Sequence, residues 1–113
     1  MFTNNSETAS RTLLPGIDMK TLTWGERTLL AQFEIEMNSR IPEHHHPYEQ
    51  IGYLVSGRLQ LTIGTETRTA EAGDSWCVPA DTPHAALALL PCVAIEVFSP
   101  PRADYMPNKA AAS

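Results

Sequence analysis

Short runs of alternating apolar and polar residues, separated by turn residues, recur along most of this chain. Residues 29–37 alternate cleanly, and their apolar face carries Leu29, Ala31, Phe33, Ile35 and Met37. Further strand candidates cover 51–55, 58–63, 66–70, 75–78, 85–90 and 93–98. Glycine, proline, serine and aspartate lie between these runs, and no segment has the length and period of a helix. Strands recurring about every 8–12 residues predict an antiparallel β-sandwich or barrel.

Two intervals between these runs are short enough to be hairpin turns. Ser56-Gly57 lies between 51–55 and 58–63, and Gly64-Thr65 lies between 58–63 and the next run. Glycine readily adopts the positive φ that tight turns need. We therefore predict a hairpin at each of these two dipeptides.

The length of the chain suits one domain. Its 113 residues, 42% of them hydrophobic, are enough to enclose one compact core. We place the domain at residues 11–102. Residues 1–10 are polar and are expected to be flexible, and 103–113 are expected to form a tail with little to bury.

Charge and hydropathy exclude several classes of partner. The net charge is -5 and Lys and Arg form no cluster, which argues against binding nucleic acid. The first ten residues lack the apolar region of a secretory signal. The longest apolar stretch, 85–98, contains Pro91 and Glu96 and is shorter than the ~20 residues that span a bilayer. We therefore expect a soluble, cytoplasmic protein without a membrane partner.

The chain has two cysteines, Cys77 and Cys92. In a reducing compartment, both are interpreted as small buried hydrophobic residues. A disulfide and a thiolate metal ligand remain as alternatives.

All four histidines lie in two places: His44, His45 and His46 are adjacent, and His84 stands alone downstream. If the first run is extended, His44, His46 and Gln50 share one face and can converge, while His45 points away. Imidazole nitrogens suit Zn, Ni, Fe, Cu and Mn, and three of them with one oxygen donor make a neutral ligand set. A solvated loop for the triplet and a backbone-capping turn residue for His84 are the alternatives.

The spacing of these residues resembles the paired motifs of the cupin superfamily. The first motif is His44-x-His46-x3-Gln50-x6-Gly57, and the second is Gly73-x5-Pro79-x4-His84. The resemblance implies an all-β, double-stranded β-helix (jelly-roll) barrel of antiparallel strands. It also implies one divalent transition metal (Ni, Zn, Fe or Mn), bound by His44, His46, Gln50 and His84.

The chain departs from the cupin pattern at three positions. Gln50 stands where Glu is usual, so the ligand set loses a charge. Asp81 stands where Gly is frequent, and Asp tolerates the left-handed turn conformation. Ala88 stands where Asn is common.

A closer resemblance extends from about Leu14 to Tyr105. The strings Leu-Pro-Gly near residue 15, His-Pro-Tyr-Glu-Gln-Ile-Gly-Tyr at 46–53 and Glu-Val-Phe-Ser-Pro-Pro-Arg at 96–102 resemble the single-domain KdgF group, named for pectin degradation. The resemblance implies an isomerase-like enzyme that converts 4,5-unsaturated uronates into linear 4-deoxy-5-keto sugar acids. It also implies a homodimer, for which the 22–24 segment and strand edges near the N-terminus are candidate contacts.

In the KdgF group, an acidic residue, an aromatic residue and an arginine of the last strand lie near the metal. The matching residues here are Glu96, Phe98 and Arg102, and Glu96 is one methylene longer than the usual Asp. Glu96 and Phe98 share a strand face, so both point into the barrel if Glu96 does. A carboxylate there requires a partner, for which the metal and Arg102 are the candidates, and is suited to acid–base chemistry.

These residues suggest roles in catalysis. Arg102 would bind the carboxylate of a small anionic substrate, and Glu96 would move the proton that turns an enol into a ketone. The alternatives are a solvent-facing Glu96, Phe98 as plain core and Arg102 in an ion pair at the rim. The remaining aromatic and Met candidates are interpreted as packing residues without a role: Tyr48, Tyr53, Trp76 and Met37.

Two other functions are compatible with the same residues. Three imidazoles with open coordination positions also suit an Fe or Mn oxygenase. The second alternative is a barrel that binds a small ligand without catalysing a reaction. Arg102 together with Glu96 favours an anionic substrate and proton transfer, which an oxygenase does not need.

Overall fold

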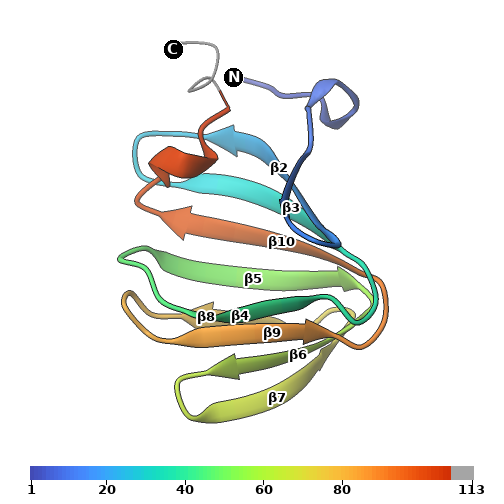
Figure 1. The fold of residues 1–113 in the computed structure, drawn as a ribbon. Coiled ribbons are helices and arrows are strands. Elements are labelled where there is room, and N and C mark those ends of the chain that lie inside the picture. The colour runs from blue at the N-terminus through green and yellow to red at the C-terminus, as the bar shows by residue number, and fades with distance from the viewer. Residues whose placement is uncertain (108–113) are drawn as a thin grey trace.

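The computed structural model describes residues 1–107, which form ten strands in two antiparallel sheets around one core (Figure 1). The larger sheet has the order β1 (Arg11–Leu14), β2 (Ile17–Trp24), β3 (Leu29–Ile35), β10 (Cys92–Ser99), β5 (Glu49–Ser56) and β8 (Ser75–Val78). The smaller sheet has the order β4 (Arg40–His44), β9 (His84–Ala88), β6 (Arg58–Ile63) and β7 (Glu66–Glu71). The predicted all-β jelly roll of antiparallel strands is confirmed.

The strand pattern accounts for most of this architecture, with one wrong pairing. The hairpin of β6 and β7 through Gly64 forms as predicted. The hairpin predicted for 51–55 and 58–63 is wrong, because β5 pairs with β10 and β8 whereas β6 pairs with β7 and β9. Gly57 lies between them with φ 98°, and a Cβ there would lie 2.2 Å from the carbonyl oxygen of Pro91. The turn therefore carries the chain from one sheet to the other.

Strand alternation also sets which side chains face the core. Along β10, Cys92, Ala94, Glu96 and Phe98 are buried, and the residues between them are only partly covered. β3 follows the same alternation, but it ends at Ile35. Met37, which the pattern placed on the apolar face, lies beyond the strand and is 52% exposed.

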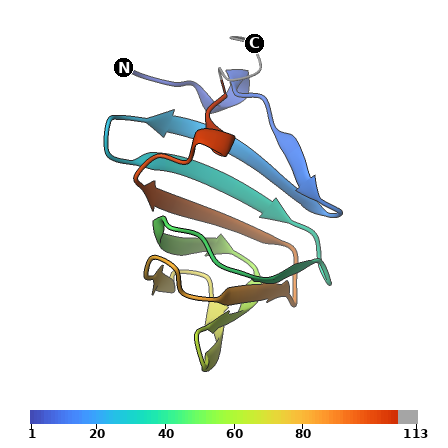
Figure 2. The same cartoon turned by 60° about the vertical axis from the view of Figure 1, so that its left-hand side comes forward.

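Beyond the strands, two short 3-10 turns are described. The first, η1 (Asn5–Glu7), lies in the segment expected to be flexible, and the Asn5 side chain contacts Gln32 and Lys20. The second, η2 (Ala103–Tyr105), lies beside the β2–β3 end of the larger sheet (Figure 2).

The segment expected to be a tail with little to bury contributes to the core. Tyr105 is only 8% exposed, and its ring packs edge-to-face on Phe33 and Phe98. The hydroxyl of Thr21 donates to the Tyr105 carbonyl. The rest of that expected tail, 108–113, lies outside the described residues.

The two cysteines differ in their surroundings. Cys92 is buried, as predicted, whereas Cys77 is exposed. The prediction was wrong for Cys77 because its neighbours in β8, Trp76 and Val78, take the inward positions of the strand.

Within residues 1–107, no helix has the length and apolar character needed to cross a bilayer.

Candidate metal centre

Three of the four histidines converge at one end of the barrel. His44 ends β4 and His84 begins β9, and the two are Cα partners in the smaller sheet. His46 lies in the connection to β5, and one ring nitrogen of each of the three lies within 4.8 Å of the others. His45 is exposed. The predicted convergence of His44, His46 and His84 is therefore observed, although the segment is a strand end and a loop rather than one continuous strand.

Each of the three imidazoles is oriented by a hydrogen bond to the backbone. In each ring Nδ1 faces a carbonyl oxygen, which only accepts, so Nδ1 carries the proton and Nε2 carries the lone pair. The distances are 2.9 Å from His44 to Pro42, 3.1 Å from His46 to Tyr48 and 2.8 Å from His84 to Thr82. The backbone thereby presents three Nε2 lone pairs for coordination.

The surroundings of these lone pairs fit a cation. Nε2 of His84 is buried, and no described residue provides a hydrogen-bond partner for it. Nε2 of His46 lies 3.0 Å from Oε1 of Gln50, although the amide nitrogen of Gln50 donates to Glu96 at 2.6 Å. Nε2 of His46 and Oε1 of Gln50 are thus two acceptors that face each other, and Nε2 of His84 is a third acceptor without a partner. A buried acceptor without a partner is destabilising. A divalent ion bound by these three groups removes all of these conflicts.

Glu96 lies directly behind Gln50, on the inward face of β10. It is 9% exposed, and its Oε1 accepts from Nε2 of Gln50 at 2.6 Å and from Nε1 of Trp76 at 3.0 Å. The expectation that Glu96 faces the interior together with Phe98 is confirmed. The hydrogen-bond partners were not foreseen, because Arg102 was the expected protein partner of the carboxylate.

Trp76, interpreted from the sequence as a packing residue without a role, donates a hydrogen bond to Glu96 at this site. Its β8 position is in register with Gly52 of β5, and a Cβ on Gly52 would lie 2.3 Å from the indole ring. Glycine inside a strand often marks such a close approach. Gly52 was therefore the available signal that a large side chain crosses β5 at this point.

Burial perturbs the acid–base properties of the site. Desolvation raises the pKa of Glu96 to about 7, against the hydrogen bonds from Gln50 and Trp76, which lower it. Desolvation also lowers the pKa of His84 to about 4 and lowers that of His46. Before any cation binds, His46 and His84 are therefore neutral at pH 7, the form in which histidine coordinates a metal.

Arg102 lines the same cavity as the histidines and Glu96. Aromatic rings and one carboxylate hold its guanidinium in place. Its guanidinium carbon lies 3.9 Å from the ring centre of Tyr105 and 5.1 Å from that of Phe98. Asp104 accepts from Nε at 3.2 Å and from Nη2 at 2.8 Å. Arg102 does form an ion pair, yet no described residue accepts a hydrogen bond from Nη1. That edge of the guanidinium remains available to an anion.

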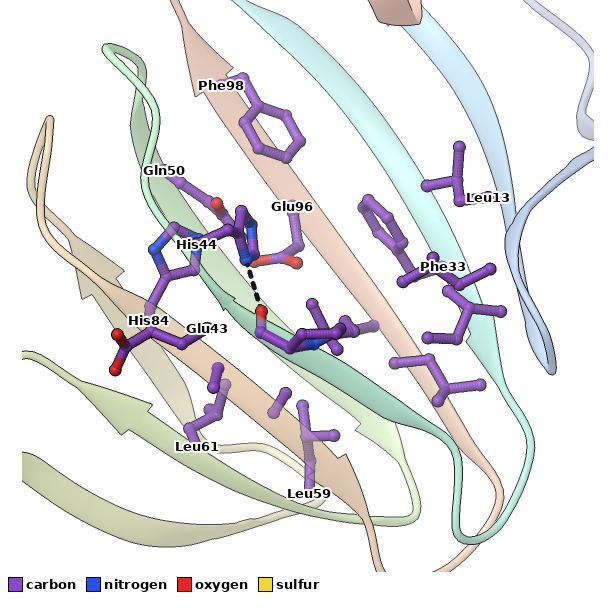
Figure 3. Close-up of a pocket in the computed structure, with 18 of the residues that line it drawn as sticks. Leu13, Phe33, Glu43, His44, Gln50, Leu59, Leu61, His84, Glu96 and Phe98 are labelled. Atoms are coloured by element: carbon purple, nitrogen blue, oxygen red, sulfur yellow. Dashed lines mark hydrogen bonds between the residues drawn. The ribbon is translucent and has the colours of Figure 1, made fainter.

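A cavity of about 380 Å³ joins these groups to the barrel interior. Its polar lining comes from both sheets and includes His44, Gln50, His84, Glu96 and Arg102. Figure 3 shows His44, Gln50 and Glu96 gathered on one side of it, with Phe98 next to them. The arrangement places a group of three histidines that could hold a metal, a carboxyl with a raised pKa and an arginine around one cavity.

Comparisons with known proteins agree with this geometry. Residues 31–98 match the family model described as "Cupin domain". The pectin degradation protein KdgF of Dickeya dadantii (strain 3937) is 28% identical over 104 residues, which cover 90% of this chain and 94% of that protein. The structure of KdgF from Halomonas sp. matches with a TM-score of 0.89 and 30% identity, covering 94% of this chain and 98% of that one. An RmlC-like cupin from Shewanella frigidimarina has the same TM-score at 23% identity, which supports the fold alone.

Proposed function

This chain belongs to the cupin family and is similar to KdgF proteins over most of its length, and from this premise we propose a metal-dependent uronate ketonase. Its substrates are 4,5-unsaturated uronates, and its products are linear 4-deoxy-5-keto sugar acids. The observation that carries the proposal is the placement of Gln50, whose Oε1 faces Nε2 of His46 at 3.0 Å while its amide nitrogen donates to Glu96 at 2.6 Å. It connects the histidine group to a carboxyl that is able to hold a proton at neutral pH.

The ligand set consists of Nε2 of His44, His46 and His84, with Oε1 of Gln50 as the fourth donor. When bound there, a divalent metal supplies Lewis-acid polarisation of a substrate oxygen. All four ligands are neutral, so the ion keeps its full charge. Imidazole ligands suit Ni, Zn, Fe and Mn alike, and elemental analysis of protein purified without added metal identifies which one is bound.

Arg102 and Phe98 position the substrate. The free Nη1 edge of Arg102 binds the uronate carboxylate, while Asp104 and the aromatic rings hold the guanidinium in place. Phe98 is buried at the end of β10 and contacts His46 edge-to-face, at 6.1 Å between ring centres. It closes the apolar side of the site against water.

Glu96 carries the proton transfer. Opening of the sugar ring leaves an enol across carbons C4 and C5, and its conversion to the ketone needs a proton at C4 and loss of the hydroxyl proton at C5. The protonated carboxyl of Glu96 donates to C4, and the carboxylate that remains takes up the hydroxyl proton. Atoms and charge balance without another reactant. A pKa near 7 keeps both forms of Glu96 populated at neutral pH, as general acid–base catalysis requires.

The test is turnover of unsaturated mono-uronates by the purified protein. The conjugated C4–C5 double bond absorbs ultraviolet light, so its loss reports ring opening and ketonisation, and NMR identifies the keto product. We expect turnover that a chelator abolishes and added metal restores. His45→Ala is the matched control, because His45 adjoins both ligands but is exposed, and we expect it to retain full activity.

One result would overturn the proposal. Metal-loaded protein that leaves every unsaturated uronate unchanged is not a ketonase. Oxygen consumption by the same preparation with another substrate would point to an oxygenase.

A further inference from the structure

The cavity continues past the polar groups into a part lined by hydrocarbon. This part, here called the apolar chamber, is bounded by Leu13, Ile17, Phe33, Ile35, Leu59 and Leu61. Figure 3 shows Leu13 and Phe33 on the side away from His44 and Gln50, with Leu59 and Leu61 below. The chamber and the metal centre belong to one cavity of about 380 Å³, within the usual size range of small-molecule sites.

Small side chains at inward positions keep this chamber open. Ala86 of β9 lies opposite Leu61 of β6, and Ala94 of β10 lies opposite Phe33 of β3. Both alanines are buried and line the cavity. A methyl group at such a position leaves volume that a leucine would fill, and cores normally pack without such voids.

A sugar acid matches only one end of this cavity. Its carboxylate and hydroxyls find partners among the imidazoles, Glu96 and Arg102, whereas a hydroxyl in the apolar chamber would lose its hydrogen bonds to water without replacement. We propose that this cavity also binds amphipathic monocarboxylates, with the carboxylate at the polar end and a hydrocarbon tail in the apolar chamber. This second ligand class is independent of the proposed reaction.

The size of the expected effect follows from burial of the tail. Each methylene transferred from water into an apolar environment strengthens binding about fourfold. Affinity should therefore rise along a series of unbranched acids until the tail fills the chamber, and then stop rising. A ligand held only by its carboxylate would show no such dependence on length.

Calorimetric titration of the full-length protein with butanoate, hexanoate, octanoate and decanoate measures this dependence. We expect about fourfold tighter binding per added methylene at the start of the series. Octanol, which lacks the carboxylate, should bind at least tenfold more weakly than octanoate. Equal affinities for butanoate and octanoate would overturn the proposal, and so would tight binding of octanol.

Two variants at one cross-strand pair control for general effects on folding. Ala86→Leu narrows the chamber and should shorten the optimal acid, whereas Leu61→Ala widens it and should lengthen the optimal acid. The double variant exchanges the two side chains and should restore the wild-type optimum. Circular dichroism and thermal melting confirm that each variant is folded. Loss of affinity in all three without a change in preferred length contradicts a tail in this chamber.

Turnover of unsaturated uronates, assayed on the same preparations, separates this inference from the proposed function. Uronate turnover without chain-length dependence refutes the second ligand class and leaves the ketonase intact. Chain-length dependence without turnover supports the second ligand class and refutes the ketonase.

Discussion

The two ends of the cavity are built from neighbouring residues but obey different physical constraints. On β10, Ala94 lines the apolar chamber, and Glu96, two residues later, belongs to the polar end. At the polar end, each side chain is held by a named partner, as Gln50 and Trp76 hold Glu96. In the apolar chamber, the fit of a ligand depends only on the volume of the chamber and on the hydrocarbon character of its lining. Changes at the polar end should therefore alter chemistry more than stability, and changes in the chamber should alter ligand size.

The largest effect that distinguishes the two ends is expected for Glu96→Gln. The amide still accepts hydrogen bonds from Gln50 and Trp76 but transfers no proton, so turnover of unsaturated uronates should fall about 100- to 10,000-fold. Metal content should stay within about twofold of wild type, because the amide keeps the hydrogen bonds to Gln50 and Trp76. Steady-state kinetics and elemental analysis measure the two quantities.

The control for this variant is Glu34→Gln, the same change at an exposed position of β3. It should leave turnover unchanged. Wild-type turnover by Glu96→Gln would remove Glu96 from the mechanism and leave the metal as the main catalytic group.

The next largest effect concerns the metal alone. His84→Ala removes one of the three lone pairs that the backbone orients, and metal affinity should fall at least about 100-fold. Competition with a chromophoric chelator measures the affinity, and His45→Ala should match wild type. Loss of affinity in His45→Ala but not in His84→Ala would mean that the metal binds to the adjacent histidines 44–46 rather than to the group that includes His84.

The polar end and the apolar chamber also differ in how far the sequence predicts them. Motif spacing identified His44, His46 and His84 as candidate ligands, although His46 lies in a loop and not on the single strand that the parity argument assumed. The KdgF resemblance identified Glu96 and Phe98, and strand alternation placed both on one face. The donors to Glu96 were not predictable in the same way, because Trp76 reaches it across β5 over Gly52, a contact between segments far apart in sequence. The error at Gly57 has a similar cause, since a turn residue alone does not say which sheet the next strand joins.

The apolar chamber was harder to predict. Alternation shows that Ala86 and Ala94 face inward, but whether an inward alanine leaves a void depends on the residue packed against it. That neighbour is known only after the register of β6 with β9 and of β3 with β10 is known. Similarly, Tyr105 lies outside the regular strands, so no periodicity marked it as a core residue.

The pH dependence of stability tests the polar end in metal-free protein. Between pH 4.5 and 7 the native state holds a proton on Glu96 that the unfolded chain releases, so this group makes stability fall as pH rises. His84 acts oppositely, because between about pH 4 and 6.5 the unfolded chain binds a proton that the native state excludes. His46 acts in the same direction as His84. The contributions oppose each other in the wild-type protein.

Glu96→Gln removes the contribution that makes stability fall as pH rises and leaves the opposite contributions of His84 and His46. Stability of the variant should rise with pH from 5 to 6.5, where the wild-type curve is flatter. The slopes should differ by at most about 1.4 kcal/mol per pH unit, the value for one proton. Urea unfolding in the presence of chelator measures both curves. Parallel curves would mean that Glu96 titrates normally in the folded protein.

The smallest expected effect comes from the indole that crosses β5. Trp76→Phe keeps a ring over Gly52 but removes the Nε1 donor, so the charged form of Glu96 loses stabilisation and its pKa rises further. If protonated Glu96 donates to C4, the alkaline limb of the pH–rate profile should move up by about one pH unit. Tyr53→Phe, at a half-exposed position of β5, should leave the limb in place. An unmoved limb in Trp76→Phe would assign that limb to a group other than Glu96, because a hydrogen bond to one carboxylate perturbs the titration of that carboxylate most.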